Sequence, residues 1–213
     1  MARDPEDPRE RWDARYAVGD WVDARQPAVL LADAEPWLGP PGVALDLAAG
    51  AGRNALFLAE RGWRVLAADL SFEGLGRLDR RARRKRLPVL PVLARLPRLG
   101  VRPGAFDLVV NTHFLCRPAF PLIRRALRPG GLLLFETYSV HELEELGGDV
   151  RREYCLERGE LRSAFDDFEV LLYEEGVFER QEGERGLARL IARKKGKAGG
   201  PEAGGPEAGG RKA

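Results

Sequence analysis

The sequence predicts an α/β fold in which a single domain forms a doubly wound sheet of seven strands, mostly parallel, with an antiparallel C-terminal hairpin. Short apolar runs alternate with helical segments along the chain, which favours a parallel sheet covered on both faces. The runs at 108–110 and 132–135 are uniformly apolar, as strands buried on both faces are. The length of 213 residues corresponds to about one domain.

The elements of this fold are expected where apolar runs and helix-ending residues fall along the chain. Gly62 is placed to end the helix after the first strand, and Pro88 to stop a later, basic helix. The expected strands span residues 43–48, 64–69, 89–93, 106–111, 131–137, 168–174 and 186–193. The expected helices span residues 12–16, 27–34, 53–61, 72–86, 119–127, 141–146 and 158–165. We expect the last two strands to form the antiparallel pair that closes the sheet.

The chain is expected to divide into one folded domain and two unstructured ends. Residues 1–11 are polar and contain prolines, so we expect a disordered N-terminus. The domain spans residues 12–193. Residues 194–213 contain a repeated Ala-Gly-Gly-Pro-Glu unit, which is typical of a flexible, low-complexity tail.

The most informative segment is 43–54, which reads Val-Ala-Leu-Asp-Leu-Ala-Ala-Gly-Ala-Gly-Arg-Asn. Gly50 and Gly52 allow the backbone to turn sharply and to approach a ligand closely. The first turn of the helix that follows leaves N–H groups unpaired, and these can receive an anionic group. The second strand ends in Asp69, whose carboxylate can accept both hydroxyls of a ribose. Such a βαβ unit is typical of proteins that bind a nucleoside-bearing cofactor.

The glycine pattern alone leaves the cofactor open. Residues 50–55 fit G-x-G-x-x-A, which nicotinamide and flavin enzymes also use, so a nicotinamide-binding oxidoreductase is one alternative. Asp46 favours another cofactor, because an acid four residues before the first glycine suits a ligand with a free ammonium group. S-adenosyl-L-methionine carries such a group together with a carboxylate, a ribose and an adenine. A structural alternative is that Asp46 only caps the turn by accepting backbone N–H groups.

These segments resemble the class I methyltransferases that use S-adenosylmethionine. The segments that carry this resemblance are 45–52, 67–71, 106–111 and 127–134. Further segments resemble the tellurite-resistance-type branch of that class: 12–16 (Trp-Asp-Ala-Arg-Tyr), 52–55 (Gly-Arg-Asn-Ala), 135–137 (Phe-Glu-Thr) and 158–161 (Arg-Gly-Glu-Leu). The resemblance covers about residues 12–193. It implies a Rossmann-like methyltransferase domain, an S-adenosylmethionine-dependent methyltransferase activity and S-adenosylmethionine as the cofactor.

The resemblance also implies a set of cofactor contacts. The expected cofactor-binding residues are Tyr16, Asp46, Ala48, Gly50, Gly52, Asp69, Leu70 and Asn111. Two positions depart from the pattern of the class. Ala48 stands where a third glycine is common, and alanine is small enough to replace it. Arg95 stands where an acid often meets the adenine amino group, which leaves the adenine contact open.

The acceptor side of the site offers two candidate bases, His113 and Tyr138. Asn111 ends the fourth strand, at the sheet edge where such folds bind ligands, although asparagine is also a routine strand terminator. His113, two residues later, is the candidate general base for a hydroxyl or amine acceptor, with Tyr138 second. A structural histidine at a loop edge is the alternative. His141, the other histidine, is expected at the surface.

The N-terminal aromatic pair has two compatible interpretations. Trp12 and Tyr16 are four residues apart, so they share one face of a helix. They can pack this helix onto the domain, or they can form a lid that excludes water from the cofactor.

Composition narrows the class of protein. No run of 18 apolar residues exists, and the polar N-terminus has no apolar core typical of a secretion signal. Two cysteines form neither a metal-binding spacing nor a disulfide framework, so we expect no metal and a cytoplasmic protein. Arginine outnumbers lysine and only two Asn and two Gln occur, a bias that fits a thermophile or a GC-rich genome.

The charge distribution favours a small-molecule acceptor. The net charge is +2, but the tail is basic and the body is close to neutral. Residues 77–86 hold seven basic side chains, which leaves an RNA methyltransferase as an alternative, although a solvated helix face is the simpler interpretation. A module that binds the cofactor without turnover is a third alternative, supported by Arg95 and by the lack of a clear catalytic residue.

Overall fold

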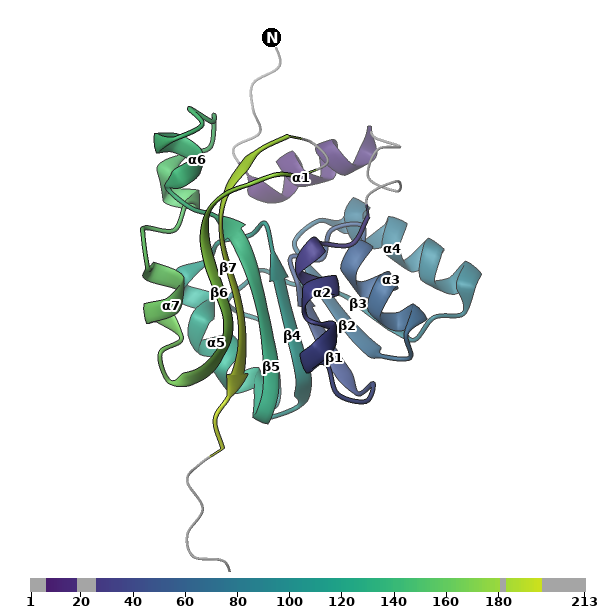
Figure 1. Ribbon diagram of the computed structural model, residues 1–213. Helices are drawn as coiled ribbons and strands as arrows, with labels where there is room; N and C mark the ends of the chain where they lie inside the picture. Colours follow the sequence, from purple (N-terminus) through teal and green to yellow (C-terminus); the bar gives the residue numbers. More distant parts are fainter. Residues whose placement is uncertain (1–6, 19–25, 181–182, 197–213) are drawn as a thin grey trace, which may run out of the picture.

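A computed structural model describes residues 7–18, 26–180 and 183–196 of the chain, and the arrangement of these residues is drawn in Figure 1. They form a seven-stranded sheet in the order β3-β2-β1-β4-β5-β7-β6. The strands are β1 (Val43–Leu47), β2 (Arg64–Asp69), β3 (Val89–Leu93), β4 (Phe106–Thr112), β5 (Leu127–Tyr138), β6 (Phe168–Phe178) and β7 (Arg185–Lys194). Strands β1 to β5 are parallel, and β7 pairs antiparallel with both β5 and β6. The predicted fold class is therefore confirmed.

Helices cover both faces of the sheet. One buried apolar cluster packs β-strand residues against α2 (Val29–Asp33), α3 (Arg53–Glu60) and α4 (Phe72–Lys85). The other packs the opposite face against α5 (Phe120–Ala126) and α7 (Glu160–Ala164). The remaining helices are α1 (Pro8–Ala17), α6 (His141–Glu144) and the short 3-10 turns η2 (Glu35–Trp37), η3 (Arg117–Ala119) and η4 (Arg152–Tyr154).

Helices α1 and α6 lie at one end of the sheet, drawn at the top of Figure 1, beside the carboxyl ends of the parallel strands. This is the edge at which ligands bind in open α/β sheets. Within the part of the chain that the structure describes, no helix is long and apolar enough to span a bilayer.

The observed elements differ from the predicted ones mainly at their ends. Helix α1 begins at Pro8, inside the range expected to be disordered, because Asp7 caps it by accepting a hydrogen bond from Arg9 N at 3.0 Å and proline suits the first helical turn. Strands β6 and β7 are longer than predicted and extend together beyond the body of the sheet. Of the predicted tail, only residues 194–196 lie within the described residues, and Lys194 ends β7.

Candidate cofactor site

The glycine loop after β1 brings three of the expected site residues into unusual backbone conformations. Ala48, Gly50 and Gly52 have φ angles of 54°, 54° and 79°. A Cβ atom on Gly50 would overlap the hydroxyl of Tyr16, and one on Gly52 would overlap the side chain of Leu78 in α4. Gly50 is therefore required by the approach of α1, whereas Gly52 is required by the packing of the domain.

Asp69 ties this loop to the end of β2. Its Oδ2 accepts a hydrogen bond from Gly50 N and its Oδ1 one from Ser71 N, both at 2.7 Å. The side chain is only 8% exposed, and burial raises its pKa against the opposing effect of these hydrogen bonds. A carboxylate has about four acceptor positions, so these bonds leave capacity for ribose hydroxyls. Leu70 follows it, half-buried, at the same strand end.

Asp46 is a buried carboxyl, and one of its oxygen atoms receives no hydrogen bond from the described residues. It is 1% exposed, and its Oδ2 has no hydrogen-bond partner among the described residues. Burial raises its pKa to about 7, with the charge of Arg53 acting against this shift and that of Asp69 adding to it. A buried acceptor without a donor costs free energy, so the site is suited to a ligand that brings its own donor.

The helix that follows the loop contributes two residues that the pattern analysis left without a role. Arg53 opens α3, and its guanidinium donates to Gln26 O at 3.4 Å. Asn54 is buried, accepts a hydrogen bond from Ala28 N at 3.0 Å and donates to Thr112 Oγ1 at 2.9 Å. Asn54 thus fastens the loop to the start of α2 and to the end of β4. The Gly-Arg-Asn-Ala segment was the available signal for both residues.

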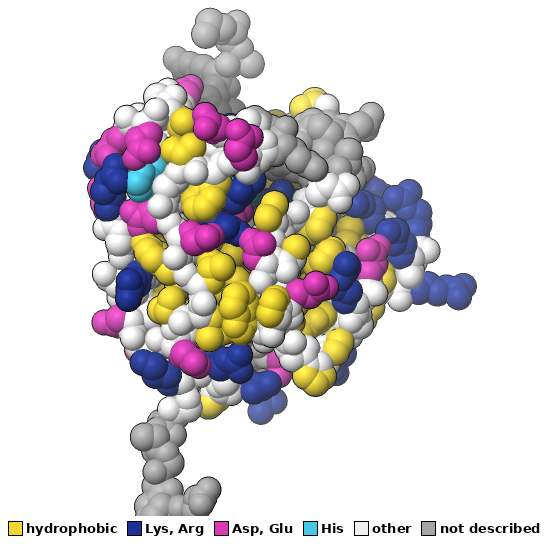
Figure 2. Space-filling view, viewed as in Figure 1, with side chains coloured by type: hydrophobic (Ala, Val, Ile, Leu, Met, Phe, Trp, Pro, Cys, Tyr) yellow, Lys and Arg dark blue, Asp and Glu magenta, His cyan; other side chains and the backbone are white. Residues whose placement is uncertain are grey.

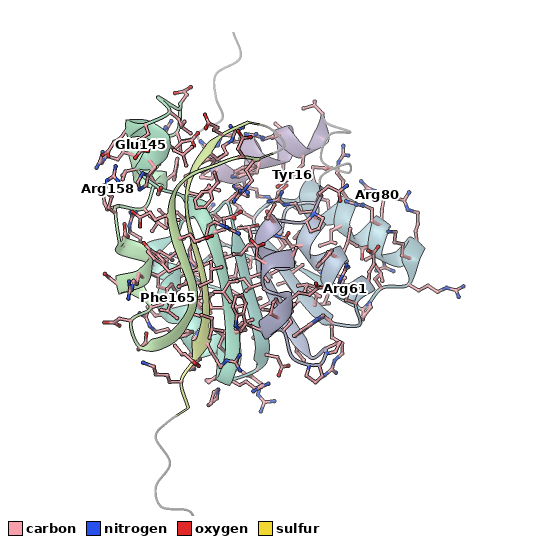
Figure 3. The ribbon with its side chains drawn as sticks, viewed as in Figure 1. Tyr16, Arg61, Arg80, Glu145, Arg158 and Phe165 are labelled. Atoms are coloured by element: carbon pink, nitrogen blue, oxygen red, sulfur yellow. The ribbon has the colours of Figure 1, made fainter. Side chains whose placement is uncertain are left out.

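Tyr16 reaches the same loop from the N-terminal helix. Its ring stacks on Trp12 with centroids 5.9 Å apart, and it lies between α1 and the start of α4 (Figure 3). A Cβ atom on Gly74 would be 3.1 Å from the Tyr16 ring, so glycine in α4 leaves room for the tyrosine. The structure therefore brings Tyr16, Gly50 and Asp69 together at one strand edge.

The next strand end carries the acceptor-side candidates. Asn111 pairs with Leu47 of β1 in the sheet, and its side chain donates to Phe114 O at 2.7 Å, which shapes the loop after β4. In this loop His113 has a φ of 54° and donates its backbone N–H to Glu136 O at 2.8 Å. A cofactor contact of Asn111 and a catalytic role of His113 stay predictions.

His113 faces a buried acid that the sequence did not single out. Its Nε2 lies 3.8 Å from Glu136 Oε1, and its ring is 5.8 Å from that of Tyr138. Glu136 is 1% exposed and accepts hydrogen bonds from Arg189 Nε at 3.1 Å and from Arg180 at 3.2 Å. The acceptor side is therefore lined by paired charges rather than by a lone carboxylate.

His141 corrects one expectation, because it is 7% exposed rather than a surface residue. Its Nδ1 lies 2.5 Å from Glu145 Oε1 and its Nε2 3.3 Å from Glu175 Oε1, and the guanidinium of Arg158 lies against the ring. Glu145 and Arg158 lie side by side near α6 in Figure 3. The long β6 places Glu175 over α6, which no local pattern in the helix indicates. Acidic and basic side chains alternate over this region in Figure 2.

The described residues give little support to thiol chemistry or to a metal site. Cys116 and Cys155 are free thiols, and burial raises the pKa of both. No group of three or more His, Cys, Asp or Glu side chains in the described part of the chain is arranged to hold a metal ion.

Comparison with known proteins finds one family model that matches part of the chain. Residues 44–131 match the model of a family described as a methyltransferase domain. No curated protein matches the chain. Among solved structures, TehB from Haemophilus influenzae has a TM-score of 0.70 at 20% identity, over 88% of this chain and 67% of that one.

Two further solved structures show the range of proteins with this fold. The 1,6-didemethyltoxoflavin-N1-methyltransferase from Burkholderia thailandensis has a TM-score of 0.69 at 22% identity, over 88% of this chain and 87% of that one. The [4+2]-cyclase SpnF has a TM-score of 0.65 at 20% identity, over 78% of this chain and 80% of that one. The match over residues 44–131 agrees with the predicted resemblance to methyltransferases, and these solved structures, TehB among them, show the same fold.

Proposed function

We propose that this chain, which contains a class I methyltransferase domain, transfers a methyl group from S-adenosylmethionine to a small molecule. The observation that carries the proposal is the buried Oδ2 of Asp46 beside the glycine loop, for which the described residues supply no hydrogen-bond donor. An ammonium group would supply the missing donor and the opposite charge. A nicotinamide dinucleotide would instead bring its pyrophosphate to this loop, where a buried carboxylate repels it.

The residues around the loop fit each part of S-adenosylmethionine. Asp46 would bind the ammonium group, and Arg53, whose charge already acts on Asp46, would bind the carboxylate. Asp69 would accept the ribose hydroxyls through its remaining acceptor positions. Tyr16 would cover the ligand from α1 and exclude water. When bound, the cofactor supplies a methyl group on a sulfonium that is already activated for displacement.

The protein's own part in the reaction would be alignment of the acceptor. The loop after β4 holds His113 at the edge of this site, where it would take the proton of a hydroxyl or amine acceptor. Glu136 fixes the same loop through its backbone oxygen at 2.8 Å from His113 N. A soft anionic acceptor would need no base.

A small-molecule acceptor is favoured over RNA by the surface charge. Basic side chains gather on the side of the molecule where α4 lies (Figure 2), but two of them are paired with acids. Arg83 lies 2.7 Å from Asp79, and Lys85 lies 2.5 Å from Glu60. The similar Burkholderia enzyme is described with a bound small acceptor, 1,6-didemethyltoxoflavin, which fits the same class. The two free thiols suit the cytoplasm, which we keep as the proposed location.

Cofactor binding without methyl transfer is the second candidate, because the cyclase SpnF shares the fold. Calorimetry with S-adenosylhomocysteine and NAD tests the cofactor: we expect micromolar binding of the first and none of the second, and the reverse would overturn the proposal. Transfer of labelled methyl groups to the small-molecule fraction of a cell extract tests the reaction. Tight binding without transfer to any fraction would favour the second candidate, and transfer only to RNA would favour the RNA alternative.

A further inference from the structure

Helix α1 is held at the cofactor site by a carboxylate that caps another helix. Asp13 Oδ1 accepts hydrogen bonds from Ser71 Oγ at 2.6 Å and from Glu73 N at 3.1 Å, at the N-terminus of α4. Ser71 itself caps α4 by accepting from Gly74 N at 3.0 Å. Although burial opposes it, these bonds hold the pKa of Asp13 below its usual value. A charged carboxylate at a helix N-terminus is stabilised by the exposed N–H groups and by the helix dipole.

The hydrogen bonds of Asp13 are continuous with those of the candidate cofactor site. Ser71, whose hydroxyl meets Asp13, donates its backbone N–H to Asp69 Oδ1 at 2.7 Å. Asp69 in turn accepts from Gly50 N at 2.7 Å. A continuous chain of hydrogen bonds thus joins α1 to the expected ribose-binding acid and to the glycine loop.

An ion pair holds the beginning of the same helix. Asp7, the capping residue of α1, accepts a hydrogen bond from Arg95 at 3.2 Å. Arg95 is the residue that stands where an adenine-binding acid is common in the class. Its guanidinium binds the capping residue of α1, so the arginine at this position has a structural role. The pair is half-exposed, so it contributes less than the Asp13 contact.

Asp13 fixes the place of Tyr16, because the two residues are three positions apart on one short helix. Tyr16 Oη lies against Gly50, and its ring lies against Gly74. If Asp13 were released from α4, α1 would lose two hydrogen bonds to the N-terminus of that helix, and Tyr16 would lose its position over the loop.

We propose that Asp13 is a positioning residue that couples docking of α1 to cofactor binding, acting through Tyr16 rather than by touching the cofactor. The inference rests on the proposed function, since it concerns the same site. It assigns the Trp-Asp-Ala-Arg-Tyr segment two tasks: Asp13 anchors the helix, and Tyr16 covers the ligand.

The test compares Asp13→Ala with Glu10→Ala, which removes the same charge from an exposed position of the same helix. Alanine favours helix formation, and each change removes only one weak contact of α1 itself: Asp13→Ala removes the ion pair with Arg9 at 3.5 Å, and Glu10→Ala removes an acid from the first turn. We expect Asp13→Ala to weaken S-adenosylhomocysteine binding about tenfold, the lower end for loss of a charged hydrogen bond, and Glu10→Ala to leave it within twofold. Hydrogen exchange across residues 8–17 should stay fast in Asp13→Ala at saturating ligand, whereas the wild type slows.

A double-mutant cycle with Tyr16→Ala separates coupling from a general structural effect. If Asp13 acts through Tyr16, adding Asp13→Ala to Tyr16→Ala should cost little further affinity. Fully additive losses, or an Asp13→Ala affinity equal to that of Glu10→Ala, would overturn the inference while wild-type binding upheld the proposed function. No wild-type binding of S-adenosylhomocysteine would instead overturn the proposed function.

Discussion

Replacing Asp46 by asparagine should stabilise the cofactor-free protein at neutral pH, even though it removes a binding residue. The pKa of this carboxyl is raised from 3.8 to about 7 by burial. Between these values the folded protein holds a proton that the unfolded chain releases. The free energy of unfolding therefore falls as the pH rises. The loss is absent below the pKa of Asp46 in the unfolded chain, and it is complete above the pKa in the folded protein.

The size of the effect follows from the shift. Each unit of pKa corresponds to about 1.4 kcal/mol, so ionisation of Asp46 costs the folded state about 4 kcal/mol above pH 7. The asparagine amide brings N–H groups without acceptors, which costs about 1–3 kcal/mol at any pH. The net gain at pH 7.5 should be about 1–3 kcal/mol, and the advantage of the variant should grow by about 3 kcal/mol between pH 4.5 and pH 7.5.

Urea unfolding at these two pH values, followed by tryptophan fluorescence, measures the difference. Asp107→Asn is the matched control, because the pKa of Asp107 is shifted in the other direction. Asp107 is partly buried, but hydrogen bonds from Val43 N at 2.7 Å and Arg128 Nε at 2.5 Å hold its pKa below the usual value. Asp107→Asn should therefore cost nearly the same free energy of unfolding at pH 4.5 and at pH 7.5, because both values lie above the unfolded pKa of 3.8. An advantage of Asp46→Asn that did not change with pH would refute the reasoning from burial.

Three further outcomes are expected. Because Asp46 must ionise to bind an ammonium group, S-adenosylhomocysteine should bind about 20-fold more weakly at pH 5.5 than at pH 7.5 in calorimetry. The control ligand 5′-methylthioadenosine has no ammonium group, so its affinity should lack most of this pH dependence. Gly50→Ala places a Cβ atom on the tyrosine hydroxyl of α1, so it should weaken ligand binding more than tenfold, whereas Gly39→Ala, with no neighbour within 4 Å, should not change it. Lys194→Met removes hydrogen bonds of 2.6 and 2.7 Å to two carbonyls at the end of α5, so it should lower the free energy of unfolding by about 1–3 kcal/mol, while Lys195→Met should leave it within error.

The sequence predicted the sheet, and it placed the candidate cofactor residues at one end of it, because the signals for both are local. Asp46, Gly50 and Asp69 lie at the ends of apolar strands, where the strand and turn pattern itself places a ligand. Uniformly apolar runs likewise located the buried parallel strands. Strand and helix ends were less certain, since capping and pairing partners decide them.

Contacts between distant segments lay beyond the local pattern. Asp13 meets Ser71 58 residues away, and Glu136 meets Arg189 53 residues away. The burial of His141 depends on how far β6 extends past the body of the sheet. Each of these depends on strand register or helix docking, which only the assembled fold determines.

The charged residues around Arg189 affect the register in which the C-terminal hairpin pairs with the sheet. Arg189 stands directly opposite Glu136 of β5 and opposite Glu174 of β6, so the three form one row across the sheet. Its guanidinium bonds both carboxylates, Glu174 at 2.5 Å, and also Asp33 of α2. A slip of β7 by one residue would turn Arg189 to the other face and take it away from the buried Glu136. The row therefore selects a single register for the strand that closes the sheet.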